Sequence, residues 1–151
     1  MRYTVQEVSS LSSASVRTLR YYDQIDLLKP AYYGNNGYRY YEEEQLIRLQ
    51  HILFFRELGL PLADIRQIVE QPSFDQAEAL QQHRQLLSAQ VERLERLIHT
   101  IDRTITNLEN SHPVEAHQLF DGFDAKQQNN CLRELRDSYG IHQLQPPLIT
   151  I

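Results

Sequence analysis

The chain has 151 residues and a formal net charge of −5, which suits one modest domain or a small domain with an extension and excludes a polycation that coats nucleic acid indiscriminately. Its single cysteine, Cys131, excludes both a disulfide framework within one chain and an iron–sulfur cluster held by four cysteines. No apolar run reaches membrane-spanning length, so we expect a cytoplasmic protein with no membrane partner.

The basic residues are concentrated at the start of the chain. Residues 1–40 hold five Lys/Arg and three Asp/Glu, whereas the remainder holds ten and seventeen. A basic head on an acidic body indicates an anionic partner at the head.

Two short helices are expected first. "TVQE" (4–7) has the capping-box pattern, and the serine cluster "SLSSAS" (10–15) separates its helix from a second one that ends near residue 24. Arg17, Arg20, Tyr21 and Gln24 share one face of this second helix. A solvated charged face is one interpretation. The other is a helix-turn-helix, whose second helix enters the DNA major groove.

A β-hairpin is expected next, in "AYYGNNGYRYY" (31–41). Asn36-Gly37 is a strong hairpin signal, since both residues tolerate positive φ, and Pro30 restricts the first strand to a sheet edge. The second strand opens with Tyr38-Arg39, which again pairs an aromatic with a basic residue. This segment is either a mere connector or a second part of the basic surface.

Three further helices are expected, over 42–59, 60–72 and from a Ser73–Gln76 cap to about residue 110. From Leu87 onward, the apolar positions of the last helix alternate in steps of four and three, which is a coiled-coil seam. Because the chain has no second long helix, we expect the partner to be another copy, with Arg84 fixing the register. The predicted dimerisation residues are Leu80, Leu87, Val91, Leu94, Ile98, Ile101, Ile105 and Leu108.

The order "SVRTLRYYD", "GYRYY" and "LQHILFFRELGLPLADIRQIV" resembles the MerR family of bacterial transcription regulators over residues 1–109. The resemblance implies a mainly α fold: a winged helix-turn-helix head (1–72) with a β-hairpin wing and a second helix pair, then a dimerisation helix (73–110) forming an antiparallel coiled coil. The seam by itself favours a parallel pair. We follow the family for the orientation.

The resemblance also implies a mechanism, in which a homodimer binds palindromic double-stranded promoter DNA and distorts the spacer so that RNA polymerase reads both promoter elements, as an activator does. The base-edge contact is assigned chiefly to Arg17. Backbone or ribose contacts are assigned to Tyr21, Tyr38 and Arg39. Thr18, Arg20 and Tyr22 complete the predicted DNA-binding set, with Tyr22 expected nearer the protein side.

Two residues depart from the family pattern. Many relatives have glycine in the turn where this chain has Ser13, so serine must take a negative φ there or tolerate strain. Tyr32 stands where relatives often carry arginine in the wing. We expect weaker or altered wing anchoring from that change.

Residues 117–140 resemble the opening of the drug-binding domain of TipA-like members, and residues 111–151 are expected to be a short, truncated effector region that binds no drug-like inducer tightly. No metal site is expected, since the long helix has no thiolate at either end and His112 and His117 alone are too few ligands. No cofactor and no catalytic set are expected either. The alternative function is a truncated subunit that heterodimerises with a longer relative.

Overall fold

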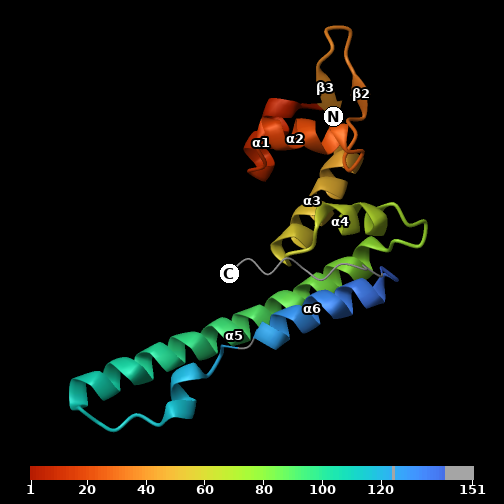
Figure 1. Cartoon of the computed structure of the whole chain (residues 1–151). Helices are drawn as coiled ribbons and strands as arrows, with labels where there is room; N and C mark the ends of the chain where they lie inside the picture. The colour runs from red at the N-terminus through yellow and green to blue at the C-terminus, as the bar shows by residue number, and fades with distance from the viewer. Residues whose placement is uncertain (124, 142–151) are drawn as a thin grey trace. The chain divides into compact units, whose positions relative to one another are not determined.

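The computed structural model describes residues 1–123 and 125–141. The chain divides into two compact units, residues 1–80 and 81–151 (Figure 1). The fold is mainly helical with one small antiparallel sheet, which confirms the predicted fold class. Within the described residues, no helix combines the length and the apolar character needed to cross a membrane.

The first two helices form the predicted helix-turn-helix. α1 (Val5–Ser12) begins with the capping box, in which the Glu7 backbone N–H donates to Thr4 Oγ1 and the Thr4 N–H donates to the Glu7 carboxylate. α2 (Val16–Gln24) is capped by Ser15, whose Oγ accepts from the Thr18 N–H at 3.0 Å. Ser13 between them takes a positive φ of 65°, so serine tolerates the left-handed conformation here.

The sheet has three short strands in the order β1-β3-β2, with β1 at Tyr3–Thr4, β2 at Tyr32–Tyr33 and β3 at Arg39–Tyr41. Tyr40 pairs with Thr4 on one side and with Tyr32 on the other. In the hairpin loop the Gly37 N–H donates to the Gly34 carbonyl at 2.9 Å, and only Gly37 of the loop has a positive φ. The hairpin prediction is confirmed, but the Asn36 φ is not positive as the Asn-Gly signal implied.

A second helix pair completes the first unit. α3 (Glu43–Glu57) starts at a capping box between Glu42 and Gln45, and it packs on α4 (Leu62–Val69). Between them Gly59 takes a φ of 86° and ends the α3 segment as predicted. The buried core that joins these helices to α2 and β3 contains Leu19, Tyr22, Leu27, Leu28, Tyr41, Leu49, Ile52, Phe55, Ile65 and Ile68.

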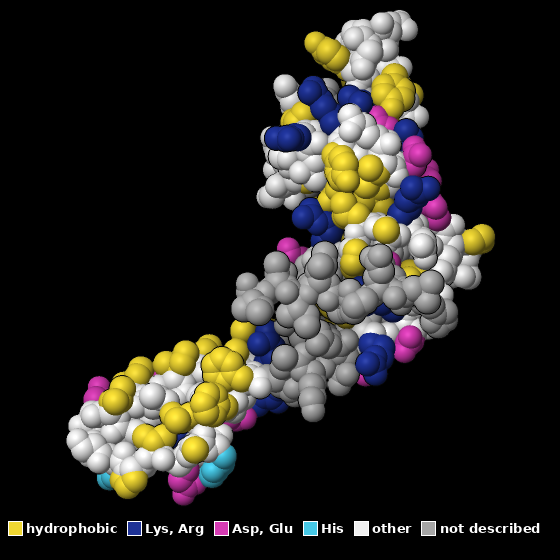
Figure 2. All heavy atoms as spheres, viewed as in Figure 1, with side chains coloured by type: hydrophobic (Ala, Val, Ile, Leu, Met, Phe, Trp, Pro, Cys, Tyr) yellow, Lys and Arg dark blue, Asp and Glu magenta, His cyan; other side chains and the backbone are white. Residues whose placement is uncertain are grey.

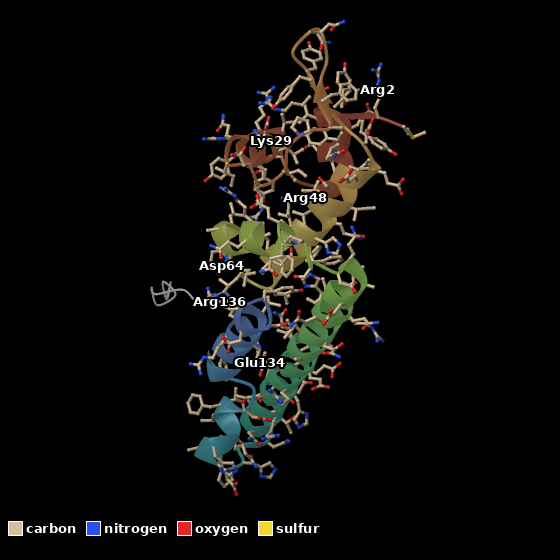
Figure 3. The ribbon with its side chains drawn as sticks, turned by 90° about the vertical axis from the view of Figure 1, so that its right-hand side faces the viewer. Arg2, Lys29, Arg48, Asp64, Glu134 and Arg136 are labelled. Carbon is tan, nitrogen blue, oxygen red and sulfur yellow. The ribbon has the colours of Figure 1, made fainter. Side chains whose placement is uncertain are left out.

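The long helix α5 spans Gln76–Asn110, and its cap is Asp75 rather than Ser73, because the Glu78 N–H donates to Asp75 Oδ1 at 3.2 Å. After α5 come a 3₁₀ segment, η1 (Ala116–Phe120), and α6 (Ala125–Ser138). Figures 1 and 3 show α6 running beside α5. Part of the region expected to be a truncated effector is therefore helical. Residues 142–151 of that region lie outside the described residues.

Candidate nucleic-acid interface

The predicted basic and aromatic face of α2 is exposed. Arg17, Arg20 and Gln24 are exposed, and 49% of Tyr21 is accessible to solvent. The opposite side of the helix buries Leu19, Tyr22 and Asp23 against the core. Thr18 is half-buried, and its hydroxyl accepts a hydrogen bond from Ser15 Oγ at 2.8 Å. The helix thus presents two arginines and a tyrosine to solvent while its other face fixes their direction.

Tyr22 does not belong to this exposed face. Its side chain is 1% exposed, and its hydroxyl accepts a hydrogen bond from Arg56 Nη1 of α3 at 2.8 Å. The tyrosine therefore ties α2 to α3 inside the head. We remove Tyr22 from the predicted DNA-binding set, because a side chain enclosed by the core has no surface to offer a duplex.

Residues of the wing and of α2 meet in a hollow of about 320 Å³. Three of its lining residues, Arg20, Tyr38 and Arg39, were predicted as DNA-binding from sequence, and the first turn of α1 forms the opposite wall. The start of a helix carries a partial positive charge and free backbone N–H groups. The hollow therefore combines arginine side chains, a tyrosine that is 64% exposed and a helix N-terminus, which suits a phosphate of a nucleic-acid backbone.

A buried carboxylate, Asp23, connects α2 to the wing, and it is the residue of this surface that the sequence analysis missed. Asp23 is 3% exposed. Its Oδ2 accepts from Arg39 Nε at 2.7 Å and from the Tyr33 hydroxyl at 2.5 Å, and its Oδ1 lies 2.9 Å from Lys29 Nζ. Asp23 follows the buried Leu19 by four residues, so both lie on the same apolar face of α2. An acidic residue at such a position could have indicated a buried carboxylate with partners on another element.

The charges around Asp23 determine its ionisation. Burial alone would raise its pKa, but the hydrogen bonds from Tyr33, Arg39 and Lys29 outweigh burial and hold the pKa below its ordinary value. The hydrogen bond between Tyr33 and Asp23 also raises the pKa of the Tyr33 hydroxyl, which therefore keeps its proton and donates it. Asp23 is therefore ionised at neutral pH and accepts from both wing strands at once. Arg39 is consequently a positioning residue for the wing as well as a predicted DNA contact.

The opposite face of the wing carries a second cluster, formed by Arg2, Tyr32 and Tyr40. The Tyr32 and Tyr40 rings stack with centroids 5.3 Å apart, and the Arg2 guanidinium lies 4.9 Å from the centre of the Tyr40 ring. Arg2 Nη1 also donates to the Tyr32 hydroxyl at 3.3 Å. Tyr32 stands where relatives often carry arginine. It therefore has an arginine beside it all the same, Arg2, which precedes β1.

The predicted dimerisation residues lie along one side of α5, and most are exposed. The exposed fractions are 38% for Leu80, 53% for Val91, 50% for Leu94, 58% for Ile98, 57% for Ile101, 47% for Ile105 and 76% for Leu108, while Leu87 is half-buried. Such a row of exposed aliphatic side chains at seam spacing has the form of an unpaired coiled-coil surface. Pairing with a second helix stays a prediction.

Among residues 1–123 and 125–141, no three His, Cys, Asp or Glu side chains gather closely enough to hold a metal ion. His117 lies instead 3.5 Å from the Glu115 carboxylate at the surface.

Comparison with known proteins identifies the family. Residues 3–72 match the family described as MerR HTH family regulatory protein, and residues 46–110 match the family described as MerR, DNA binding. The HTH-type transcriptional regulator SkgA of Caulobacter vibrioides is 47% identical over 138 residues, which are 91% of this chain and 54% of that protein. The HTH-type transcriptional activator TipA of Streptomyces coelicolor is 34% identical over 137 residues, 89% of this chain and 54% of TipA.

The crystal structure of SkgA from Caulobacter crescentus superposes with a TM-score of 0.77 and covers 89% of this chain and 97% of that chain. A MerR-family regulator from Bacillus cereus, 31% identical, gives a TM-score of 0.51. The chain spans about half the length of the curated relatives it matches. The matched residues, the winged head and the identity to SkgA agree, and the chain belongs to the MerR family of helix-turn-helix regulatory proteins.

Proposed function

We propose that this chain is a transcription regulator that binds a palindromic promoter site as a homodimer and distorts the spacer DNA so that RNA polymerase can use the promoter. The observation that carries the proposal is the exposed basic face of α2 beside the hollow that Arg20, Tyr38 and Arg39 line. A helix-turn-helix presents its second helix to the major groove. The wing then contacts the backbone next to the same groove.

Each group on this surface has a chemical role in the proposal. Arg17 is exposed on α2, and an arginine there donates two hydrogen bonds to a guanine edge. Tyr21 contacts the sugar-phosphate backbone, as do the groups of the hollow. Asp23 does not touch DNA, since it would repel phosphate. Its contacts with Arg39, Tyr33 and Lys29 keep the wing at a fixed angle to α2.

The dimer follows from the exposed row on α5. Two copies paired through this row carry two heads related by a two-fold axis, so the site on DNA must be an inverted repeat. Bending a duplex so that both half-sites meet the two heads costs about 1–6 kcal/mol. The phosphate contacts of both heads offset that cost, which makes the wing as necessary as α2.

The relatives support regulation of transcription, because SkgA is named a transcriptional regulator and TipA a transcriptional activator. They do not favour the alternative of a heterodimerising subunit. We therefore keep the homodimer as the proposed active form.

The experiment that tests the function is selection of sites from random duplexes by the purified chain, followed by footprinting of the enriched sites. We expect enrichment of an inverted repeat whose two halves are protected together. Enrichment of no sequence, or of a single half-site bound by one copy, would contradict the proposal. A chain with Arg17→Ala and Arg20→Ala, both exposed residues, is the matched control and should enrich nothing.

A further inference from the structure

Two large aromatic side chains are exposed, Phe120 at the end of η1 and Phe123 in the turn that follows it. They are 66% and 69% exposed, and their rings meet edge to face with centroids 6.4 Å apart. Single exposed apolar side chains are ordinary on protein surfaces. A paired set of phenyl rings next to other exposed apolar residues is a patch, and such patches mark interaction surfaces.

This turn is fixed to the middle of α5. Thr100 Oγ1 donates to the Asp121 carbonyl at 2.8 Å. Gly122, with a φ of 92°, lies so close to α5 that a Cβ there would come 3.0 Å from the backbone nitrogen and the side chain of Leu97. The two aromatic rings are therefore held at one height on α5, and the anchoring contacts leave them facing solvent.

The turn lies beside the exposed row of α5. Leu97 and Thr100 form the face that the turn covers. Ile98 and Ile101 follow them by one residue each, which places them about 100° further round the helix. Figure 2 shows hydrophobic side chains gathered over the second half of α5 and over the segment after it. The aromatic pair is therefore anchored on the side of α5 that adjoins the row.

We propose that Phe120 and Phe123 are part of the dimer interface and dock on the first half of α5 of a second copy of this chain. The inference rests on the proposed homodimer. We take the antiparallel orientation that the family resemblance implies. An antiparallel pair that overlaps the whole row sets Leu80 of one copy against Leu108 of the other. In that register the Leu97–Thr104 stretch, with its aromatic pair, faces roughly residues 84–91 of the second copy, where Val91 is 53% exposed.

The size of the patch agrees with this occupant. A phenyl ring buries about 150–250 Å² when fully covered, so four rings that are two-thirds exposed add roughly 400–650 Å² to the interface. A stable, specific interface needs about 1,200–2,000 Å². The aromatic pairs of two copies would therefore supply about a third of the requirement, and the α5 rows would supply the rest.

The chain has no tryptophan, so one indole introduced at position 123 reports only its own surroundings. In the full chain with Phe123→Trp, we expect blue-shifted tryptophan fluorescence that is protected from quenching by acrylamide at concentrations where sedimentation shows a dimer. On dilution to the monomer, the fluorescence should shift to the red. Adding Leu94→Asp should give a monomer with red emission throughout. His99→Trp is the matched control, because His99 is exposed on the other side of α5 and its emission should stay red.

The outcomes separate this inference from the proposed function. A dimer whose indole at position 123 stays red and freely quenched would overturn the aromatic contact and leave the homodimer standing. A wild-type chain that remains monomeric at micromolar concentration would overturn both. As a second measurement, the double variant Phe120→Ala, Phe123→Ala should weaken dimerisation at least about tenfold, and an unchanged dissociation constant would contradict the inference.

Discussion

Arg39 Nε donates a hydrogen bond of 2.7 Å to Asp23 Oδ2, and this contact joins the wing to the last turn of α2. The two residues are sixteen positions apart in the chain, and the carboxylate is 3% exposed. In the proposed complex α2 and the wing contact DNA together, so their relative angle affects binding. The Asp23–Arg39 pair, with the Tyr33 hydroxyl on the same carboxylate, holds that angle.

Asp23→Asn should lower the free energy of unfolding by about 2 kcal/mol, since the variant leaves Arg39 and Lys29 without their shared anion. Urea denaturation of both proteins at pH 7 measures this loss in the free energy of unfolding. The matched control is Asp26→Asn, because Asp26 also pairs with Lys29 but its side chain is 60% exposed. An exposed pair contributes at most about 1 kcal/mol. Equal effects of the two variants would contradict the role given to Asp23.

The same variant has a pH signature. The pKa of Asp23 is lowered by folding, so the stability that its charge gives is complete above its unfolded value of about 4 and is lost as pH falls through the folded value. The stability difference between wild type and Asp23→Asn should therefore be constant from pH 7 to 5 and shrink below about pH 4.

The helices and the hairpin follow from local chemistry, which is why the sequence predicts them. Thr4 and Glu7 form their capping box through contacts three residues apart, and Gly37 and Gly59 have the positive φ that only glycine adopts freely. Arg17 and Tyr21 were placed on an exposed face by helical spacing alone, and both are exposed.

The residues that sequence reasoning missed depend on contacts between distant segments. Tyr22 was expected nearer the protein side than Tyr21, but its complete burial by the core and the hydrogen bond that it accepts from Arg56 were not predicted. Arg39 was assigned to DNA alone because its partner Asp23 lies on another element. A pattern of residue types along the chain shows which side chains are polar, but it does not show which of them meet across the fold.

His51 should make stability depend on pH near neutrality. It is 2% exposed in α3, its ring meets the Phe74 ring edge-on at 5.1 Å, and neither ring nitrogen has a hydrogen-bond partner among the described residues. Burial lowers its pKa, so its contribution is complete above the unfolded value of about 6.5 and falls with decreasing pH, by up to about 1.4 kcal/mol per unit.

His51→Leu should therefore flatten the stability profile between pH 7 and 5, as measured by chemical denaturation at each pH. His99→Leu is the control, since His99 is exposed and its loss should leave the slope unchanged. A wild-type profile that is already flat over this range would contradict the lowered pKa, because it would mean that His51 binds a proton as readily in the folded chain as in the unfolded one.

Ser13→Gly should stabilise the head. Serine at a φ of 65° bears a left-handed strain of about 1–2 kcal/mol, while glycine adds a chain-entropy cost of about 0.5–1 kcal/mol, so the net gain is about 0.5 kcal/mol. Thermal unfolding compares it with Ser10→Gly, an exposed position inside α1, where glycine should destabilise by a similar amount. The same sign at both positions would contradict the strain at Ser13.

Leu94→Asp combined with Ile98→Asp should abolish the homodimer, because each copy would place two charges in the apolar row. Both residues are at least 50% exposed in the chain by itself, so the variant keeps the fold of the monomer. Sedimentation equilibrium gives the mass, and circular dichroism checks the helix content. Glu95→Ala, on the neighbouring flank, should leave the dimer intact. If the double variant sediments as a dimer, the seam is wrong.

The most direct test of DNA reading by α2 is the affinity of Arg17→Ala for its selected site and for a scrambled duplex, across a series of salt concentrations. Loss of a base contact should cost about 1–3 kcal/mol on the selected site and much less on the scrambled one. Arg20→Ala, the matched variant on the same face, should weaken both duplexes equally and reduce the salt slope by about one. An Arg17→Ala chain that loses the same factor on both duplexes would contradict the assignment of Arg17 as the base reader.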